Sequence, residues 1–308
     1  MYIMLNNESA SPRACSWPRW SGQVCIVVIL LVCGIPRVTA GEGSHPKTSP
    51  PSATVLNFGF LPIVSPGHLV KRFSPLTEYL SQTLGLEVRL VTAPDFATFV
   101  RRTDEGRYDL LFTAPHLYYL AHRDAGYRVL ARVARDSMQA VIVAPKNGGV
   151  RTLADLAGHR LATTDPLALA TVLVRERLLR AGLEPDHDLT LVPTPSHNAS
   201  LLSTHQGVTD AAALMLPLFH HSDPSIQDNM RIVAYTRKVP HMPISVAPWV
   251  DAGLAARVRD SLFALARSAA GARVLERLGW PGLVAADEQI YADLAWTISS
   301  GTATPGAQ

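Results

Sequence analysis

The sequence predicts an α/β protein built from two successive α/β units. Short apolar stretches of strand length alternate with amphipathic stretches of helix length, and the connections between them are short. The alternation begins near Val55 and starts again near Tyr127, so each unit spans roughly 90–100 residues, a usual domain size. We therefore expect two sheets, each flanked by helices.

The first unit contains the clearest helix of the chain. Residues 68–84 carry apolar side chains three or four positions apart, the spacing of one helix face, at Leu69, Phe73, Leu76, Leu80 and Leu84. Gly85 ends this helix, Asp95 caps the next one, and Pro115 suits the first turn of a third over residues 115–125. Strands are expected at residues 55–61, 86–91 and 108–112. The third of these strands is apolar apart from Asp109.

The second run of elements ends in a helical tail. Strands are expected at residues 127–133, 139–144, 160–163, 189–192, 210–215 and 232–235. A short helix is expected to begin at Thr152, and Ser196 should cap another that runs to about His205. Further helices are expected at residues 166–181, 253–269, 272–278 and 287–298.

The first 40 residues predict an export signal. The run VCIVVILLVCGI follows Arg13 and Arg19 and precedes Val38-Thr39-Ala40, which is the order of a secretory signal peptide cleaved after Ala40. An uncleaved N-terminal anchor is the alternative, and translation from Met4 or later also fits. A lipoprotein is disfavoured because Val24 and Val32 precede Cys25 and Cys33. We expect a signal peptide at 1–40, a disordered linker at 41–53, a disordered tail at 301–308 and a periplasmic location.

Composition excludes several kinds of site. Cys15, Cys25 and Cys33 are the only cysteines, so the chain after residue 40 has neither a disulfide nor a cysteine nucleophile. The net charge is +3, and it falls to +1 without the first 40 residues, which hold three arginines and one glutamate. This balance argues against nucleic acid as a partner. His220, His221 and Asp223 lack a metal-binding spacing, so we expect no metal and no cofactor.

Four turns should follow the carboxyl ends of strands, where parallel sheets bind ligands. They cover residues 61–65, 113–116, 163–166 and 193–198, two in each unit. Four turns that face one interface would enclose a small ligand, and hinge closure is the known use of such an arrangement.

Several segments together carry a family resemblance. They are VLNFGFLP, FSPLTEYLSQTLGLEVRLVTAPDFATFV, DLLFTAPHLYYLA, LADLAGHRLATTDP, SHNASLL and VLERLGW. In order and spacing, from about Val55 to about Tyr291, they resemble the periplasmic phosphonate/phosphate/phosphite-type binding proteins of ABC transporters. The resemblance implies a two-lobed type II periplasmic binding fold, with a central mixed sheet in each lobe. Lobe one would comprise 54–135 plus 240–300, and lobe two 136–239.

The resemblance fails at the turn that would hold the ligand. Phosphonate-type members typically have Ser-Thr-Ser-Gly after the Asp-Pro turn, and its hydroxyl and N–H groups hold the oxyanion. This chain has Ala168-Leu169-Ala170-Thr171 there. His197, within Ser196-His197-Asn198, does match the family's ligand-contacting histidine. The candidate ligand-binding residues are Thr113, His116, Thr164, Leu169, Thr171, His197, Asn198 and Met215.

The sequence therefore predicts a monomeric solute-binding protein that closes over a small ligand. Loss of three hydrogen bonds to a charged ligand, each contributing about 1.5–3 kcal/mol, predicts a ligand that is not a standard phosphonate. The partner in the inner membrane is an ABC permease or, alternatively, a sensor kinase. An enzyme on the same fold is a remote alternative, because such enzymes rely on a cysteine and no GxSxG motif occurs. A pocket without any tight ligand is a further alternative.

Overall fold

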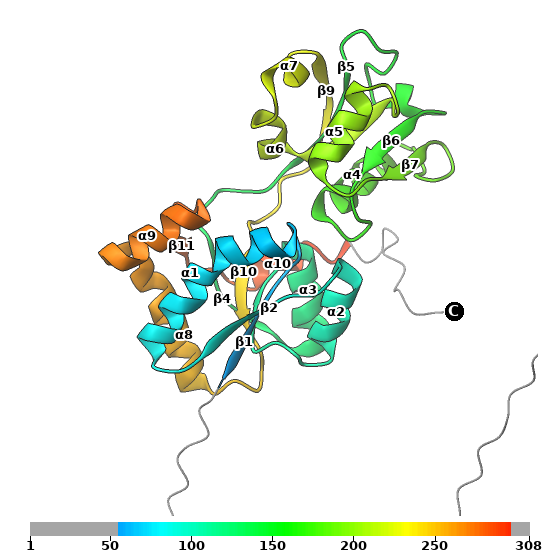
Figure 1. The fold of residues 1–308 in the computed structure, drawn as a ribbon. Coiled ribbons are helices and arrows are strands. Elements are labelled where there is room, and N and C mark those ends of the chain that lie inside the picture. Colours follow the sequence, from blue (N-terminus) through cyan, green and yellow to red (C-terminus); the bar gives the residue numbers. More distant parts are fainter. Residues whose placement is uncertain (1–54, 297–308) are drawn as a thin grey trace, which may run out of the picture. The chain divides into compact units, whose positions relative to one another are not determined.

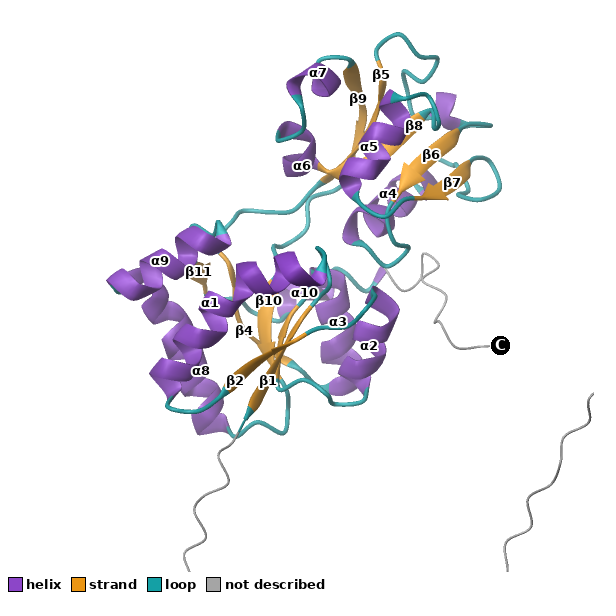
Figure 2. Ribbon diagram, in the orientation of Figure 1, coloured by secondary structure: helices purple, strands orange, loops and turns teal. Residues whose placement is uncertain are grey.

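A computed structural model describes residues 55–296, which form two β-sheets that are each covered by helices (Figures 1 and 2). The signal peptide, the linker and the tail predicted from the sequence fall on residues outside this range. Within it, no helix combines the length and the apolar character needed to cross a membrane.

The first sheet has six strands in the order β11-β4-β10-β3-β1-β2. Their bounds are β1 Leu56–Phe60, β2 Val88–Val91, β3 Leu110–Phe112, β4 Arg128–Val133, β10 Pro243–Val246 and β11 Leu283–Val284. Strand β1 is parallel to β2 and β3, whereas β10 is antiparallel to β3 and β4 and β11 is antiparallel to β4. The sheet is therefore mixed, as predicted.

Helices lie on both faces of this sheet (Figure 2). They are α1 Pro66–Leu84, α2 Phe96–Asp104, α3 Pro115–Ala125, α8 Ala252–Ala264, η2 Leu265–Arg267, α9 Ala269–Leu278 and α10 Gln289–Ala292. Helix α1 packs against α8 and α9, and α3 packs against α2 and α10. Gly85 ends α1 in the left-handed conformation, and the Asp95 side chain accepts a hydrogen bond from the Thr98 amide of α2, so both predicted helix ends are confirmed.

An aromatic cluster forms the centre of this half of the protein. The Phe73 ring of α1 lies 4.7 Å from Phe60, 5.4 Å from Phe112 and 6.2 Å from Trp280, between ring centroids. All four side chains are buried. Asp109, the charged residue of an otherwise apolar segment, has partners for both carboxylate oxygens. They accept hydrogen bonds from the main-chain N–H of Asn57 and from the indole N–H of Trp249.

The second sheet has five strands in the order β7-β6-β8-β5-β9. The elements of this region are β5 Ala140–Pro145, η1 Ala154–Leu156, β6 Arg160–Thr163, α4 Leu169–Leu179, β7 Thr190–Pro193, α5 His197–His205, β8 Ala211–Met215, α6 Leu216–His220, α7 Pro224–Gln227 and β9 Met230–Tyr235. Strand β6 is parallel to β7 and β8, and β5 is antiparallel to β8 and β9.

The two faces of this sheet carry different helices. Along β5, Ile142 packs in one core cluster with Leu173 of α4, and Val141 packs in another with Leu201 of α5. Successive side chains of a strand point to opposite faces, so α4 and α5 cover opposite faces of the sheet. Strands buried on both faces read as continuous apolar runs, which explains segments such as residues 211–215.

The chain passes between the two sheets twice, from β4 to β5 and from β9 to β10. In these connections the Met138 amide donates to the Val239 carbonyl at 2.8 Å, and the Val239 amide donates to the Met138 carbonyl at 2.9 Å. The two connecting segments are thus paired with one another.

The predicted elements within residues 55–296 are confirmed with some corrections of their bounds. Helix α4 begins at Leu169 and not at residue 166, because Asp165 accepts hydrogen bonds from the Leu167 and Ala168 amides and holds a turn there. Helix α10 is four residues long, much shorter than the helix expected from residue 287. Four short elements were missed, namely β10, β11, α6 and α7.

Candidate functional site

The carboxyl ends of β6, β7 and β8 meet at one edge of the second sheet, because these strands are parallel. Helices α4, α5 and α6 begin in the segments that follow them. Six of the eight candidate residues lie at this edge, and they are Thr164, Leu169, Thr171, His197, Asn198 and Met215.

The turn before α4 presents few polar side-chain groups. The hydroxyl oxygens of Thr164 and Thr171 lie 3.4 Å apart, and both side chains are buried. Ala168, Leu169 and Ala170, which replace the hydroxyl residues expected from the family, are also buried. This part of the site is therefore largely apolar.

His197 is the first residue of α5, whose N-terminus is capped by the Ser196 hydroxyl accepting from the Ala199 amide at 3.1 Å. Its Nδ1 atom is buried and has no hydrogen-bond partner among the residues that the structure describes. Burial lowers the pKa of His197 to about 4, so the ring is neutral at pH 7. The next residue, Asn198, is exposed.

His116 connects the first sheet to this edge of the second. It lies in the first turn of α3, and its Nε2 atom is 3.0 Å from the Leu167 carbonyl oxygen. A carbonyl only accepts, so Nε2 carries the hydrogen and Nδ1 is the unprotonated nitrogen. Nδ1 is buried and has no hydrogen-bond partner within residues 55–296, and burial lowers the pKa of His116 to about 4.

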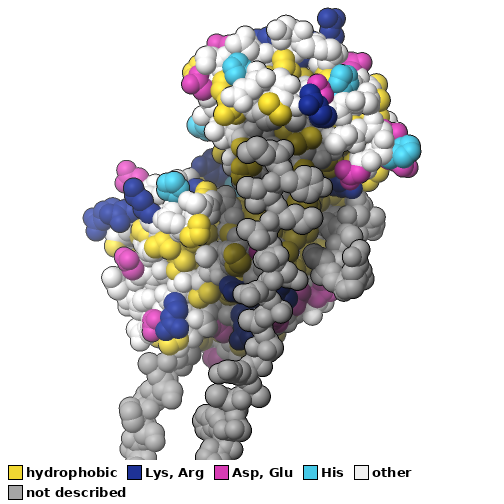
Figure 3. All heavy atoms as spheres, turned by 45° about the vertical axis from the view of Figure 1, so that its right-hand side comes forward, with side chains coloured by type: hydrophobic (Ala, Val, Ile, Leu, Met, Phe, Trp, Pro, Cys, Tyr) yellow, Lys and Arg dark blue, Asp and Glu magenta, His cyan; other side chains and the backbone are white. Residues whose placement is uncertain are grey.

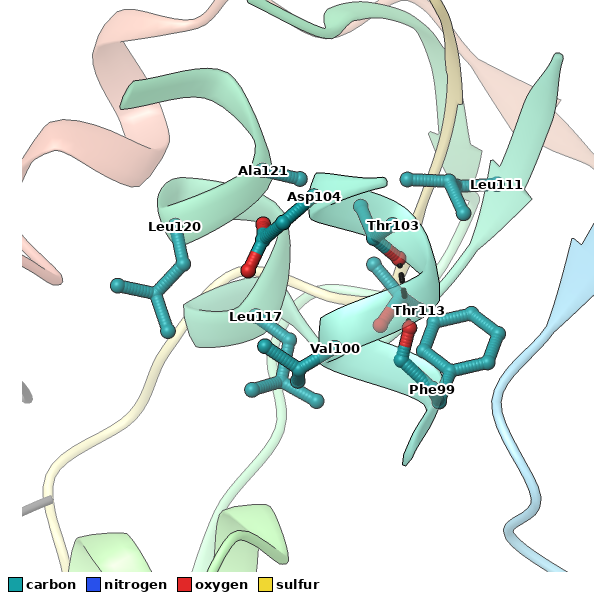
Figure 4. A pocket seen from close by; sticks show the side chains of 9 residues that line it. All are labelled: Phe99, Val100, Thr103, Asp104, Leu111, Thr113, Leu117, Leu120 and Ala121. Carbon is teal, nitrogen blue, oxygen red and sulfur yellow. Dashed lines mark hydrogen bonds between the residues drawn. The ribbon is translucent and has the colours of Figure 1, made fainter. Parts of the chain in front are cut away.

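Thr113 directly follows β3, a strand of the first sheet. Its side chain lines a cavity of about 10 Å³ between β3, α2 and α3, together with Leu111 of β3 (Figure 4). Its hydroxyl is buried and finds no hydrogen-bond partner in the described part of the chain. A volume of about 10–15 Å³ is what one water molecule needs. No hydrogen bond joins Thr113 to the other candidates within residues 55–296.

Met215 ends β8 and is 8 % exposed. With Leu169 it supplies apolar surface at the edge where His197 and Thr164 lie. The Leu167 carbonyl is a polar group at this edge that the sequence analysis did not name. A main-chain acceptor leaves no signal in side-chain chemistry, and its pairing with His116 depends on contact between residues 51 positions apart.

The eight candidates carry no permanent charge, since both histidines are neutral at pH 7. They offer imidazole nitrogens, hydroxyls and apolar surface, which suit a polar ligand of low charge. In the part of the chain that the structure describes, no cluster of three or more metal-binding side chains occurs. His221 instead contacts the Pro217 carbonyl through Nδ1, and Asp223 caps α7. On the face shown in Figure 3, basic and acidic side chains are interspersed.

Burial of neutral histidines predicts a pH-dependent stability. The pKa values of His116, His197 and His241 are lowered to about 4, against about 6.5 in an unfolded chain. Between these values the unfolded state binds more protons, so the free energy of unfolding should fall as the pH decreases from about 6.5 to about 4. Urea denaturation at a series of pH values measures this slope.

The double variant His116→Gln/His197→Gln is the control for this prediction. It removes two of the three histidines whose pKa is lowered to about 4, so its stability should depend less on pH over the same interval than that of the wild-type protein. An unchanged slope in the double variant would contradict the prediction.

The fold defines a class of protein. Two mixed sheets flanked by helices and joined by two connections form the two-lobed type II periplasmic binding fold, and solved structures of that fold are similar to this chain. XAC2383 from Xanthomonas citri, bound to chloride ion, has a TM-score of 0.72 and 20 % identity, over 80 % of this chain and 96 % of its own. PhnD1 from Prochlorococcus marinus, in complex with methylphosphonate, has a TM-score of 0.70 and 18 % identity, over 79 % and 96 %.

A third similar structure is a binding protein component of an ABC phosphonate transporter from Pseudomonas aeruginosa, with a TM-score of 0.69 and 16 % identity, over 81 % of this chain and 89 % of that one. The profile of the family described as "ABC transporter, phosphonate, periplasmic substrate-binding protein" matches residues 58–291. The chain belongs to this family of periplasmic substrate-binding proteins, which confirms the predicted resemblance, and it is a binding protein and not an enzyme.

Proposed function

We propose that this chain is the exported solute-binding component of a phosphonate-type ABC uptake system and captures a small ligand between two lobes by hinge closure. Lobe one would comprise residues 54–135 and 240–300, and lobe two residues 136–239. Membership of the family supports the transport role. The two paired connections between the sheets are where a hinge is expected in a two-lobed binding protein.

The ligand of this proposal is a polar molecule of lower charge than a phosphonate dianion. The observation that carries it is the pair of neutral imidazoles at buried His116 and half-buried His197, each with a buried Nδ1 atom that has no hydrogen-bond partner among residues 55–296. A buried nitrogen without a partner is costly, and a ligand that hydrogen-bonds to it would remove that cost. The apolar side chains at residues 168–170 offer no hydroxyl to an oxyanion.

Calorimetry tests the ligand class. We expect phosphate, phosphite and methylphosphonate to bind more weakly than micromolar, and a thermal-shift screen of amino acids, sulfonates and small uncharged solutes to yield a tighter ligand. Micromolar affinity for any of the three phosphorus oxyanions would overturn the proposed ligand class. It would leave the family assignment intact.

Replacing His197 by Ala should reduce the binding free energy of the tightest ligand from this screen by more than it reduces the free energy of unfolding, which the melting temperature reports. The Nδ1 atom of His197 has no hydrogen bond to lose within the described residues, whereas the ligand would lose one worth about 0.5–1.5 kcal/mol, or about 2- to 13-fold in affinity. Calorimetry and thermal denaturation of the same samples give both numbers. Replacing the exposed neighbour Asn198 by Ala is the matched comparison, and equal affinity in the His197→Ala variant would remove His197 from the site.

The membrane partner in this proposal is an ABC permease, which the family supports. A sensor kinase remains the alternative partner, and co-purification with each candidate membrane protein separates the two. Export by a signal peptide at residues 1–40 and a monomeric state complete the proposal. N-terminal sequencing of the periplasmic protein and sedimentation analysis test these two points.

A further inference from the structure

The two connections between the sheets are held rigidly on the side of the second sheet. Beyond the Met138–Val239 pair, the Thr236 hydroxyl accepts from the Ala140 amide at 3.0 Å, and the Gln139 side-chain amide donates to the Thr236 carbonyl at 2.7 Å. These contacts make residues 138–140 and 236–239 a continuation of the second sheet.

The pairing stops at Pro240, which has no N–H to donate. The next bond between the two connections joins the Val133 amide to the Met242 carbonyl at 3.2 Å, where the first sheet begins. Ala134 and Arg135 still belong to the first-sheet side, because the Ala134 amide donates to the Gly282 carbonyl at 2.9 Å and Arg135 Nη2 donates to the Gly279 carbonyl at 2.8 Å. Rotation of one lobe against the other should therefore be concentrated in residues 136–137 and 240–241.

Arg237 lies on the second-sheet side of this stretch, and its guanidinium has three partners. Nη1 is 3.9 Å from the Glu176 carboxylate of α4, and Nη2 donates to the Asp293 carbonyl at 3.2 Å. The guanidinium carbon also lies 4.8 Å from the ring centroid of Trp296, within the range of a cation–π interaction.

Asp293 and Trp296 belong to the first-sheet side. They follow α10, in which the Tyr291 ring packs 4.9 Å from the Tyr118 ring of α3. The Tyr291 hydroxyl also donates to the His241 carbonyl at 2.9 Å, next to the start of β10. The contacts of Arg237 therefore bridge the stretch where bending is expected.

We infer that Arg237 is a clasp across the hinge, which holds the two lobes in one orientation while the ligand is absent. Glu176 fixes the guanidinium to α4, and the Asp293 carbonyl and Trp296 ring fix it to the segment after α10. A hydrogen bond and a stacked ring tolerate displacements of only a fraction of an ångström to about one ångström, so rotation of a lobe must break these contacts. The clasp biases the equilibrium between lobe orientations and does not depend on the identity of the ligand.

Distances between spin labels in the ligand-free full chain test the clasp. The natural cysteines Cys15, Cys25 and Cys33 are replaced by Ser, and labels are attached after Val70→Cys in α1 and Val208→Cys beyond α5, two exposed positions in different lobes. We expect one narrow distance distribution for the parent protein. Arg237→Met, which keeps the apolar stem, should broaden the distribution roughly twofold or add a second population.

Arg180→Met is the matched control, because Arg180, the C-cap residue of α4, also pairs with Glu176 at 2.7 Å but makes no bridge to the first-sheet side among the described residues. Its distribution should equal that of the parent. Trp296→Leu removes the ring that Arg237 faces and should reproduce the broadening, and it decides the matter if Arg237→Met does not fold. An unchanged distribution in the folded Arg237 or Trp296 variant, or equal broadening in Arg180→Met, would overturn the inference. Since no ligand is added, this outcome is independent of the calorimetric test of the ligand class.

Discussion

Restoring hydroxyl groups at residues 168–170 is expected to raise the affinity for methylphosphonate by about 100-fold. The variant Ala168→Ser/Leu169→Thr/Ala170→Ser recreates the three hydroxyl residues of the Ser-Thr-Ser-Gly run that phosphonate-type members typically carry after the Asp-Pro turn, and it keeps Thr171 in place of the glycine. Three hydrogen bonds to a charged ligand could contribute about 4.5–9 kcal/mol, or three to six decades in affinity. We expect less than this range, because Leu169 and Ala170 are buried and their replacement disturbs packing. Calorimetry with methylphosphonate measures the gain.

The single variant Leu169→Ala is the control for this experiment. It makes room at the same turn without adding a hydroxyl, so any gain that comes from space alone would appear in it. The affinity of the triple variant should exceed that of both the wild-type protein and Leu169→Ala. If the triple variant folds and binds methylphosphonate no better than the wild-type protein, these three positions do not determine the ligand class.

The long elements of the fold were predictable because their signals are local. Helix α3 has the predicted bounds, since Pro115 fits its first turn and Gly126 closes it in the left-handed conformation. Strand β10 was missed for the opposite reason. It is only four residues long, begins with Pro243, and gains its hydrogen bonds from β3 and β4, which lie more than 100 positions earlier in the chain. Pairing between such distant segments leaves no periodic signal in a stretch this short.

The candidate site was predictable only in part. Ser196 as a cap and His197 at the start of α5 follow from residue type and order. The position of Thr113 does not, because a polar residue at the end of a strand can face either the ligand edge or the covered face of the sheet, and here it lines the cavity beneath α2 and α3. The bond from His116 to the Leu167 carbonyl likewise depends on tertiary contact.

Replacing Phe73 by Ala is expected to destabilise the protein by about 3–5 kcal/mol, the usual cost of deleting a fully buried phenyl ring. Phe73 is 1 % exposed and is the residue of α1 that contacts the rings of Phe60, Phe112 and Trp280. Its loss removes apolar burial and leaves a cavity between α1 and the sheet. Chemical denaturation followed by circular dichroism and by tryptophan fluorescence measures the change, and coincidence of the two signals checks that both lobes unfold together.

The comparison variant is Val70→Ala, three positions earlier on the same helix. Val70 is 49 % exposed, so its replacement loses little burial, and alanine is the better helix former. Its free energy of unfolding should stay within about 0.5 kcal/mol of the wild-type value. If Phe73→Ala cost no more than Val70→Ala, the aromatic cluster would not be what fixes α1 to the sheet. Residues 61–65 join β1 to α1 and form one of the four turns expected to face a ligand. In that case, contacts other than the aromatic cluster would have to hold this turn in position.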